Sequence, residues 1–477
     1  MNNLTYEQKN SIGLSYVLSG LVPVSAFGKE KAKKLPFFLP AQKSELETEL
    51  NNVEKILHGL NGQSDKFAEL THTMSMTNNI IKSIRKTASE VLDDVELFEI
   101  KCFLLRCEKI KNIFDSLDKS LMLGGIEFFD TAEALDIVDP DKTRIASFYI
   151  SDACSARLRE LRAQKSELER QISVTPKHAA QTLVSRHTET ARLEEAEELA
   201  VRTALSKALV PFKEKMEHNA EQIARLDIII AKAELAKKTG GTKPVIADEK
   251  KIAVKNMFNP FLADALSKRG ESFTPLTLTA PGGVTIITGA NMGGKSVALK
   301  TLALNLLLAQ MGFFVFAESL AAPLFDFCYM SADAERADKG LSAFGGEIVK
   351  LNETYQKAKK GFGLIVIDEF AKGTNVTEGQ AIFCAVVEAL NAKSSITVMT
   401  THYDDVSKKA NRHYQVMGLR NLDKDYVPSK NVDENINYLA KRMNYGLREV
   451  PLESGAPKEA VAVCFALGLD DEILSKL

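Results

Sequence analysis

Apolar residues recur at helical spacing through the first half of the chain. Between residues 41 and 123 they fall three and four positions apart among charged residues, with almost no glycine or proline. The clearest run is Leu46, Leu50, Val53, Ile56 and Leu57. This period is typical of amphipathic helices, and residues 136–143, with Pro140 among them, interrupt it. We therefore predict a helical body over residues 1–150.

A second pattern, with apolar residues at alternating steps of three and four, occurs twice further on. It runs through residues 151–172 and again through residues 216–233. Because such steps are typical of coiled coils, the two stretches are predicted to be antiparallel partners in a helical hairpin over residues 151–236, with residues 173–206 as its distal part. The pattern also fits two ordinary helices in a globular core. Glycines and a proline then indicate a linker over residues 237–246.

Beyond the linker, short apolar runs alternate with helical stretches. The runs are 284–288, 313–316, 364–367 and 396–400. Strands that alternate with helices predict a mostly parallel sheet covered on both faces. We therefore expect a multidomain fold, with an α-helical N-terminal half and an α/β domain over residues 247–477.

The composition narrows the class of protein. The 477 residues are 45% hydrophobic and 26% charged, with a formal net charge of -2, so nucleic-acid binding would need a local basic patch. The expected distal segment 173–206 is not basic, since it carries four basic and five acidic side chains. Six scattered cysteines without metal-ligand spacing indicate reduced thiols. Residues 13–27 lack the flank of a signal peptide and no run could span a bilayer, so we expect a cytoplasmic protein.

The residues with the clearest chemistry follow the apolar run 284–288. The sequence from Gly289 to Ser296 reads GANMGGKS and opens a helical stretch, which matches the phosphate-binding pattern G-x-x-x-x-G-K-[S/T]. In that pattern glycines let backbone N–H groups surround a triphosphate, while Lys295 reaches the outer phosphates and the Ser296 hydroxyl binds Mg²⁺. A chance glycine-rich turn before a helix is the alternative. The expected ligands are a triphosphate and Mg²⁺, held by Gly289, Gly293, Gly294, Lys295 and Ser296.

Two further strand ends carry polar side chains. The run 364–367 ends in Asp368 and Glu369, which predicts Asp368 beside the Mg²⁺ of Ser296 and Glu369 as the group that orients or deprotonates the attacking water. His402 follows the run 396–400, at an edge where α/β sites form, and we predict that it senses the γ-phosphate or holds the water. A purely structural histidine is the alternative.

These motifs carry a family resemblance. GANMGGKS, LSAFGGE, LIVIDEFAKGTNVTEG and TTHY, in that order over about residues 284–403, resemble the ATPase domain of the MutS family, relatives of the ABC-type ATPases. The helical body and hairpin resemble the family's core and lever regions more loosely.

The resemblance implies further roles. Asn291 matches the family's phosphate-loop asparagine, and His402 its switch histidine. Ser342 and Phe344 match the signature loop that reaches the ATP of the opposing subunit, which implies a homodimer with two composite sites. Phe273 matches the aromatic residue that stacks on adenine. Gly373, Thr374 and Asn375 match the loop that contributes to the dimer interface.

The chain also departs from the family pattern. Ala371-Lys372 stands where the family usually has Gly-Arg, and Gly345-Gly346 breaks the run after the signature phenylalanine. The helical body leaves no room for the N-terminal mismatch-reading domain, so a short form is expected. The tail, with residues 443–447 and 456–474, is similar to MutS-related proteins that reactivate cobalamin-dependent amino acid aminomutases.

Two functions therefore compete at this stage. In the first, the protein is an ATP hydrolase whose dimer closes around ATP, moves helical arms and acts as a DNA-structure sensor or clamp of the mismatch-repair type. In the second, the same ATPase remodels a protein client, such as an aminomutase that it reactivates. A binding module without catalysis is a third reading, which Lys295, Asp368 and Glu369 disfavour.

Overall fold

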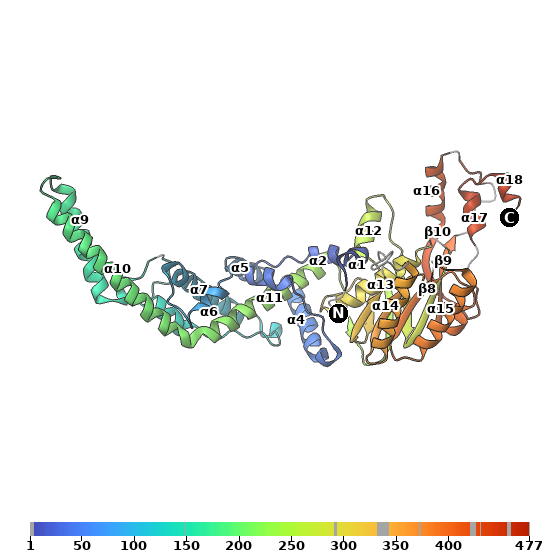
Figure 1. The fold of residues 1–477 in the computed structure, drawn as a ribbon, viewed down its shortest axis with the longest axis horizontal. Coiled ribbons are helices and arrows are strands. Elements are labelled where there is room, and N and C mark those ends of the chain that lie inside the picture. Colours follow the sequence, from blue (N-terminus) through green and yellow to red (C-terminus); the bar gives the residue numbers. More distant parts are fainter. Residues whose placement is uncertain are drawn as a thin grey trace. The chain divides into compact units, whose positions relative to one another are not determined.

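The computed structural model describes residues 4–147, 149–290, 293–331, 343–371, 374–419, 426–429, 431–455 and 459–476. The chain forms two compact units (Figure 1). The C-terminal unit contains Met1–Leu21, Pro36–Glu54 and Lys232–Leu477, and the helical unit contains Val22–Leu35 and Lys55–Ala231. Two N-terminal segments that we expected in the helical body thus belong with the α/β part. Among the described residues no helix is long and apolar enough to cross a membrane.

Helices make up the helical unit. They are α3 (Ala26–Ala32), α5 (Ser64–Ser75), α6 (Ile81–Lys86), α7 (Asp94–Asp115), α8 (Ala132–Val138), α9 (Ala156–Val174) and α10 (Gln181–Leu209), with parts of α4 (Lys43–Gly62) and α11 (Lys213–Thr239). Helix α7 begins at a capping box. The Asp93 side chain accepts a hydrogen bond from the backbone N–H of Glu96, and the Glu96 side chain accepts one from the backbone N–H of Asp93. Such reciprocal bonds satisfy two N–H groups that the helix itself leaves unpaired.

The hairpin forms between different helices from those expected. Helix α9 packs on α10, which the sequence had assigned to a distal segment, and not on residues 216–233. Ion pairs join the two helices: Arg162 contacts Glu198 at 2.7 Å and Lys165 contacts Glu194 at 2.6 Å. The turn at residues 175–180 reverses the chain.

Helix α11 packs elsewhere, and its buried Asn219 has its partner outside the hairpin. The Asn219 side chain exchanges two hydrogen bonds, 2.9 and 3.0 Å long, with the backbone of Phe129. Nearly every residue from 222 to 233 is buried. A helix that is buried on all sides is a core helix, so the stepwise apolar pattern of α11 did not mark a coiled-coil seam.

Asp227 of α11 holds the segment that leads into α3. Its carboxylate accepts hydrogen bonds from the backbone N–H groups of Val24 and Ser25, at 3.0 and 2.7 Å, and from the Ser25 hydroxyl at 2.5 Å. Ser25 in turn caps α3 by accepting from the N–H of Gly28. A Cβ atom on Gly28 would lie 2.1 Å from the carboxylate, so this close approach requires glycine. Burial raises the pKa of Asp227 and outweighs the lowering effect of these bonds.

We expect Asp227 to make the stability of the protein depend on pH. Because its pKa is raised in the folded state, its protonation favours folding below the ordinary aspartate pKa, and this contribution is lost as the pH rises through the raised value. The stability advantage of the wild type over Asp227→Asn should therefore shrink from acid to neutral pH. Urea unfolding of both proteins across that range measures it, with Asp65→Asn on the exposed side of α5 as the control. An advantage that grows with pH would contradict the assignment.

Two sheets organise the C-terminal unit. The first has the order β10-β9-β4-β8-β7-β6, in which all neighbours are parallel except β10 and β9. The second has the order β1-β5-β2-β3 and mixes parallel with antiparallel pairs. The strands are β1 (Val245–Ile246), β2 (Lys251–Met257), β3 (Leu276–Pro281), β4 (Gly283–Thr288), β5 (Ser319–Ala322), β6 (Phe327–Met330), β7 (Gly363–Ile367), β8 (Ile396–Thr401), β9 (Arg412–Leu419) and β10 (Met443–Glu449). The expected mixed α and α/β fold is confirmed, whereas the second sheet was not anticipated.

Helices cover both faces of the larger sheet. The helices of this unit are α1 (Tyr6–Ser11), α2 (Leu14–Ser19), α12 (Pro260–Ser267), α13 (Lys295–Gln310), α14 (Ala343–Ala358), α15 (Val376–Asn391), α16 (Val432–Arg442), α17 (Ala460–Ala466) and α18 (Asp471–Leu474). Buried residues of β4, β7 and β8 share one core cluster with α14 and α15. Leu299 of α13 lies with Val366, whose side chain points to the opposite face from Ile365 and Ile367.

One expected strand is absent. Residues 313–316 form only a single bridge, between Val315 and Thr242, and the strand of this region is β5. The backbone N–H of Phe316 donates instead to the side chain of Asn305 in α13, at 2.7 Å. An apolar run can thus be buried in the core without pairing in a sheet.

A buried ion pair lies at the C-terminal end of α13. The Lys232 ammonium contacts Glu49 at 2.8 Å, donates to the carbonyl of Met311 at 2.9 Å and lies 4.7 Å from the ring centre of Phe313. The Lys232 side chain is 1% exposed and that of Glu49 14%. Burial of a charged pair is tolerated only when both partners are satisfied, and here α4, α11 and the end of α13 supply the partners.

Candidate functional site

The loop between β4 and α13 is shaped by its glycines. Gly294 caps α13 with a φ of 92°, a left-handed conformation that glycine adopts without strain. A Cβ atom on Gly293 would lie 2.9 Å from the carbonyl of Ala290, and one on Gly289 would lie 3.0 Å from Val416. The tight curve brings the N-terminal N–H groups of α13 to the end of the sheet, where a helix can bind an anion.

Lys295 and Glu369 meet at this loop. The Lys295 ammonium lies 3.1 Å from a Glu369 carboxylate oxygen and also donates to the carbonyls of Gly289 and Ala290, at 2.8 and 3.1 Å. The Lys295 side chain is 3% exposed and that of Glu369 11%. Two sequence-predicted catalytic side chains are therefore in contact, although 74 positions separate them in the chain.

Ser296 and Asp368 line a common small cavity. Its volume is about 10 Å³, and Ser331, Lys300 and Val366 also line it. That volume holds roughly one water-sized sphere. A hydroxyl and a carboxylate are ligands that Mg²⁺ accepts. The residues therefore fit the expected metal, which Ser296 and Asp368 would hold. No group of three His, Cys, Asp or Glu side chains in the described part of the chain suggests another metal site.

The polypeptide that follows Asp368 adopts an unusual backbone. Glu369 and Ala371 have φ values of 43° and 65°, in the left-handed region that disfavours side chains other than glycine. Contacts on both sides hold Ala371: its N–H donates to Glu347 of α14 at 3.2 Å and its carbonyl accepts from the Tyr403 hydroxyl at 3.0 Å. Alanine at the position where the family usually has glycine is thus held in a glycine-like conformation.

The remaining predicted site residues differ in where the structure places them, and some lie outside the described residues. His402 follows β8, is exposed and lies with its ring 4.5 Å from that of Tyr403. Phe273 is half-buried in the loop between α12 and β3, and no contact of the described residues places it at the phosphate loop. Phe344, Thr374 and Asn375 are described, and Asn375 caps α15. Asn291, Ser342 and Gly373 lie outside the described residues.

Two residues near the loop were not found from the sequence. Tyr445 of β10 lies against the phosphate loop, since a Cβ atom on Gly294 would be 3.1 Å from its ring. Burial, and then the charge of Glu271, raise the pKa of Tyr445. His413 of β9 bonds to the Thr288 hydroxyl at 2.8 Å and to the carbonyl of Pro451 at 3.2 Å, and burial lowers its pKa. Both come from strands more than 100 residues after the loop, so no local pattern could place them there.

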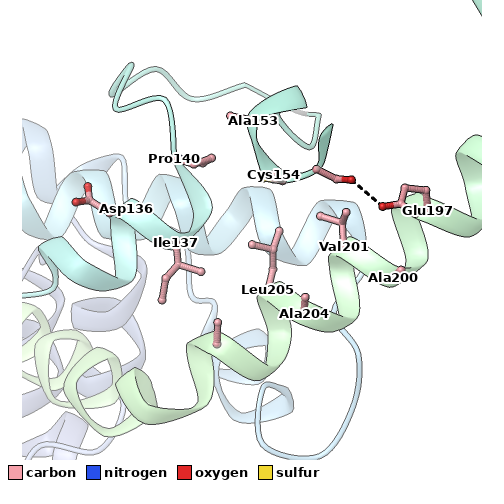
Figure 2. A pocket seen from close by; sticks show the side chains of 12 residues that line it. Asp136, Ile137, Pro140, Ala153, Cys154, Glu197, Ala200, Val201, Ala204 and Leu205 are labelled. Carbon is pink, nitrogen blue, oxygen red and sulfur yellow. Dashed lines mark hydrogen bonds between the residues drawn. The ribbon is translucent and has the colours of Figure 1, made fainter. Parts of the chain in front are cut away.

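A separate cavity lies within the helical unit. Its volume is about 570 Å³, and α8, α10 and residues 153–155 line it (Figure 2). Ile137, Val201 and Leu205 form an apolar part, and Ser155 donates to Glu197 across one side at 2.7 Å. It shares no residue with the phosphate loop, and no sequence motif pointed to it.

Comparisons with known proteins agree with this architecture. Residues 285–466 match the family model described as MutS domain V. A DNA mismatch repair protein MutS of Leuconostoc mesenteroides is 32% identical over 206 residues, 42% of this chain and 24% of the relative. An Endonuclease MutS2 of Ligilactobacillus salivarius is 30% identical over 204 residues, 42% and 25% of the two chains. A DNA mismatch repair protein MutS of Thermus aquaticus is 31% identical over 261 residues, 53% and 30%.

The C-terminal unit therefore defines an α/β domain of the MutS domain V type. The resemblance to the MutS family that the sequence motifs predicted is confirmed over this part of the chain. The chain spans less than a third of the length of the three relatives, so the similarity concerns a part of those proteins.

Proposed function

We propose that the protein is an ATP hydrolase that uses Mg²⁺. The contact between Lys295 and Glu369 at the glycine loop carries the proposal, because it joins a phosphate-binding cation to an acid–base group at a helix N-terminus. The cavity that Ser296 and Asp368 share supports the metal. The relatives are MutS and MutS2 proteins, which is consistent with the proposed ATP hydrolysis.

In the proposed reaction each residue has one task. Backbone N–H groups of the loop and the Lys295 ammonium bind the phosphate oxygens and stabilise the negative charge that develops there. Glu369 accepts a proton from the attacking water or orients it, and His402 contacts the γ-phosphate side. Mg²⁺, held by Ser296 and Asp368, neutralises charge on the phosphates. Tyr445 and Phe273 are candidates to contact the base and ribose of the nucleotide. Of the two, Tyr445 is favoured, because its ring lies against Gly294.

We further propose that two copies form composite sites, with Ser342 completing the site of the partner copy. The N-terminal part of α14, which follows Ser342, is bonded to the loop after Glu369 through Glu347 and Ala371. This hydrogen bond would connect a change at the signature loop to the segment that follows Glu369. ATP binding would then drive movement of the helical arms.

DNA is the client that we propose, because the relatives include DNA mismatch repair proteins. The charges of the hairpin argue for a weak electrostatic attraction to DNA. Basic side chains of α9 and α10 form ion pairs within the hairpin, as Arg162 and Lys165 do with Glu198 and Glu194, and further pairs join Arg170 to Glu167 and Arg192 to Glu189. Cations engaged in this way neutralise fewer DNA phosphates, so recognition by shape is favoured over a grip on the backbone. The reactivase alternative gains no support from the relatives.

The test is the ATPase rate with and without duplex, branched and single-stranded DNA over a salt series, with Glu369→Ala as the blank. We expect a basal rate that the variant lacks, a change in rate with structured DNA, and a shallow decline of DNA affinity with salt, because each phosphate contact contributes a slope of about 0.9. The specific activity should rise with protein concentration, since composite sites need two copies.

Each result decides a different part of the proposal. A basal rate equal to that of Glu369→Ala would overturn the ATPase. An intact ATPase that no DNA alters would overturn the DNA client and direct the search to proteins. Specific activity independent of concentration would argue against composite sites that assemble in this range.

A further inference from the structure

Thr400 contacts both acidic residues of the candidate site, the side chain of Asp368 and the backbone of Glu369. It is the fifth residue of β8, a strand that is buried along its whole length. β8 pairs in parallel with β7, whose C-terminal end leads directly into Asp368 and Glu369. Thr400 itself is 0% exposed. A buried hydroxyl normally needs a hydrogen-bond partner, and this one has two.

The direction of both hydrogen bonds follows from the chemistry. The backbone N–H of Glu369 lies 3.0 Å from the Thr400 hydroxyl oxygen and can only donate. The hydroxyl has one proton and lies 2.5 Å from Oδ1 of Asp368, which accepts when ionised. Thr400 therefore accepts from Glu369 and donates to Asp368. The short distance to the carboxylate is typical of a charge-assisted hydrogen bond.

We propose that Thr400 is a positioning residue of the ATPase site, which sets the Asp368 carboxylate for the metal and the Glu369 backbone for catalysis at the same time. The inference rests on the proposed ATPase function. By its bond to Oδ1, Thr400 fixes the rotation of the carboxylate that faces the cavity shared with Ser296. By its bond to the N–H of Glu369, it helps to hold that residue in its strained backbone conformation, with a φ of 43°.

Other contacts do not replace Thr400. The Ser331 hydroxyl accepts from the backbone N–H of Asp368 at 2.8 Å and so supports the main chain, not the carboxylate. The neighbouring Thr401 hydroxyl accepts from the backbone N–H of Tyr403 and is thus engaged after the strand. Thr400 alone among these three hydroxyls contacts both acidic residues.

Thr397 offers a matched control on the same strand. It is also 0% exposed, and its hydroxyl has no hydrogen-bond partner among the described residues. Replacement of either threonine by valine keeps the β-branched shape and removes a hydroxyl. Both variants therefore make the same change to a buried strand, but only Thr400→Val removes the two hydrogen bonds.

The experiment compares wild type, Thr400→Val, Thr400→Ser and Thr397→Val by two readouts. The first is the gain in affinity for a fluorescent ATP analogue when Mg²⁺ is added, and the second is kcat and the Mg²⁺ concentration for half-maximal rate. For Thr400→Val we expect kcat to fall about 10- to 100-fold, as for loss of a hydrogen bond to a charged group, with a smaller gain from Mg²⁺ and unchanged affinity without Mg²⁺. Thr400→Ser should restore both readouts, and Thr397→Val should match the wild type.

The outcomes separate this inference from the function beneath it. If the wild type hydrolyses ATP and Thr400→Val equals Thr397→Val in both readouts, the positioning role is wrong and the ATPase stands. If Thr400→Val merely unfolds, Thr400→Ser decides, because failure of serine to restore the Mg²⁺ response would overturn the role of the hydroxyl. If the wild type neither binds nor hydrolyses ATP, the function and the inference fail together.

Discussion

Replacement of Glu369 by glutamine should slow ATP hydrolysis by about 100-fold or more, because general-base groups typically contribute at least that factor. ATP binding should persist. Lys295 loses its charged partner in this variant but keeps the carbonyls of Gly289 and Ala290 at 2.8 and 3.1 Å, so the ammonium stays at the loop. Single-turnover hydrolysis and equilibrium binding of a labelled nucleotide measure the two effects separately.

Two controls define this prediction. Lys295→Ala should lose binding as well as hydrolysis, since it removes the cation that contacts the phosphates. Glu353→Gln, on an exposed part of α14, changes the same chemical group away from the loop and should leave both quantities as in the wild type. If Glu369→Gln retained more than a tenth of the rate, another group would have to be the base.

Replacement of Lys232 by methionine should destabilise the C-terminal unit by about 3–5 kcal/mol, the usual cost of removing one partner of a buried ion pair. The change leaves Glu49 without its 2.8 Å partner and the Met311 carbonyl without its donor. Chemical denaturation followed by a probe in the C-terminal unit measures the loss. The Phe313 ring also loses a cation 4.7 Å away.

A second substitution tests whether the unpaired Glu49 carboxylate causes the loss of stability in Lys232→Met. Adding Glu49→Leu to Lys232→Met removes the stranded carboxylate, so the double variant should recover part of the stability. Lys43→Met is the matched control, because its partner Asp248 is 91% exposed and exposed pairs contribute little. A double variant less stable than Lys232→Met would show that the burial of charge is not the reason for the loss.

Strong local sequence patterns were sufficient to predict the central strands and the helix that follows the glycine loop. The expected strand 284–288 and the helix that begins at Lys295 are β4 and α13, and the runs 364–367 and 396–400 are β7 and β8. These segments combine a buried apolar run with a chemical motif at its end, so both period and motif indicated the same structure. The similarity of residues 285–466 to MutS domain V was predicted from the same motifs.

The rest depended on contacts between distant segments. The partner of α9 could not be chosen from its heptad pattern, because both α10 and α11 carry apolar residues at helical steps. In the structure Leu158 packs with Val201 of α10, and Arg162 and Lys165 form ion pairs with the same helix. Thr400 gave no signal, since threonine is common in strands and its role appears only when β7 and β8 are paired. Tyr445 reaches Gly294 through the pairing of β10 with β9.

The left-handed turn at Ala371 limits how this region can vary between related sequences. Alanine at a φ of 65° costs more than glycine, and the Glu347 carboxylate and the Tyr403 hydroxyl hold it there. A lineage with glycine at this position could lose either partner without changing the path of the loop. A lineage with alanine could not, so Ala371, Glu347 and Tyr403 should be inherited as a set, and glycine should return where one of the partners has been lost.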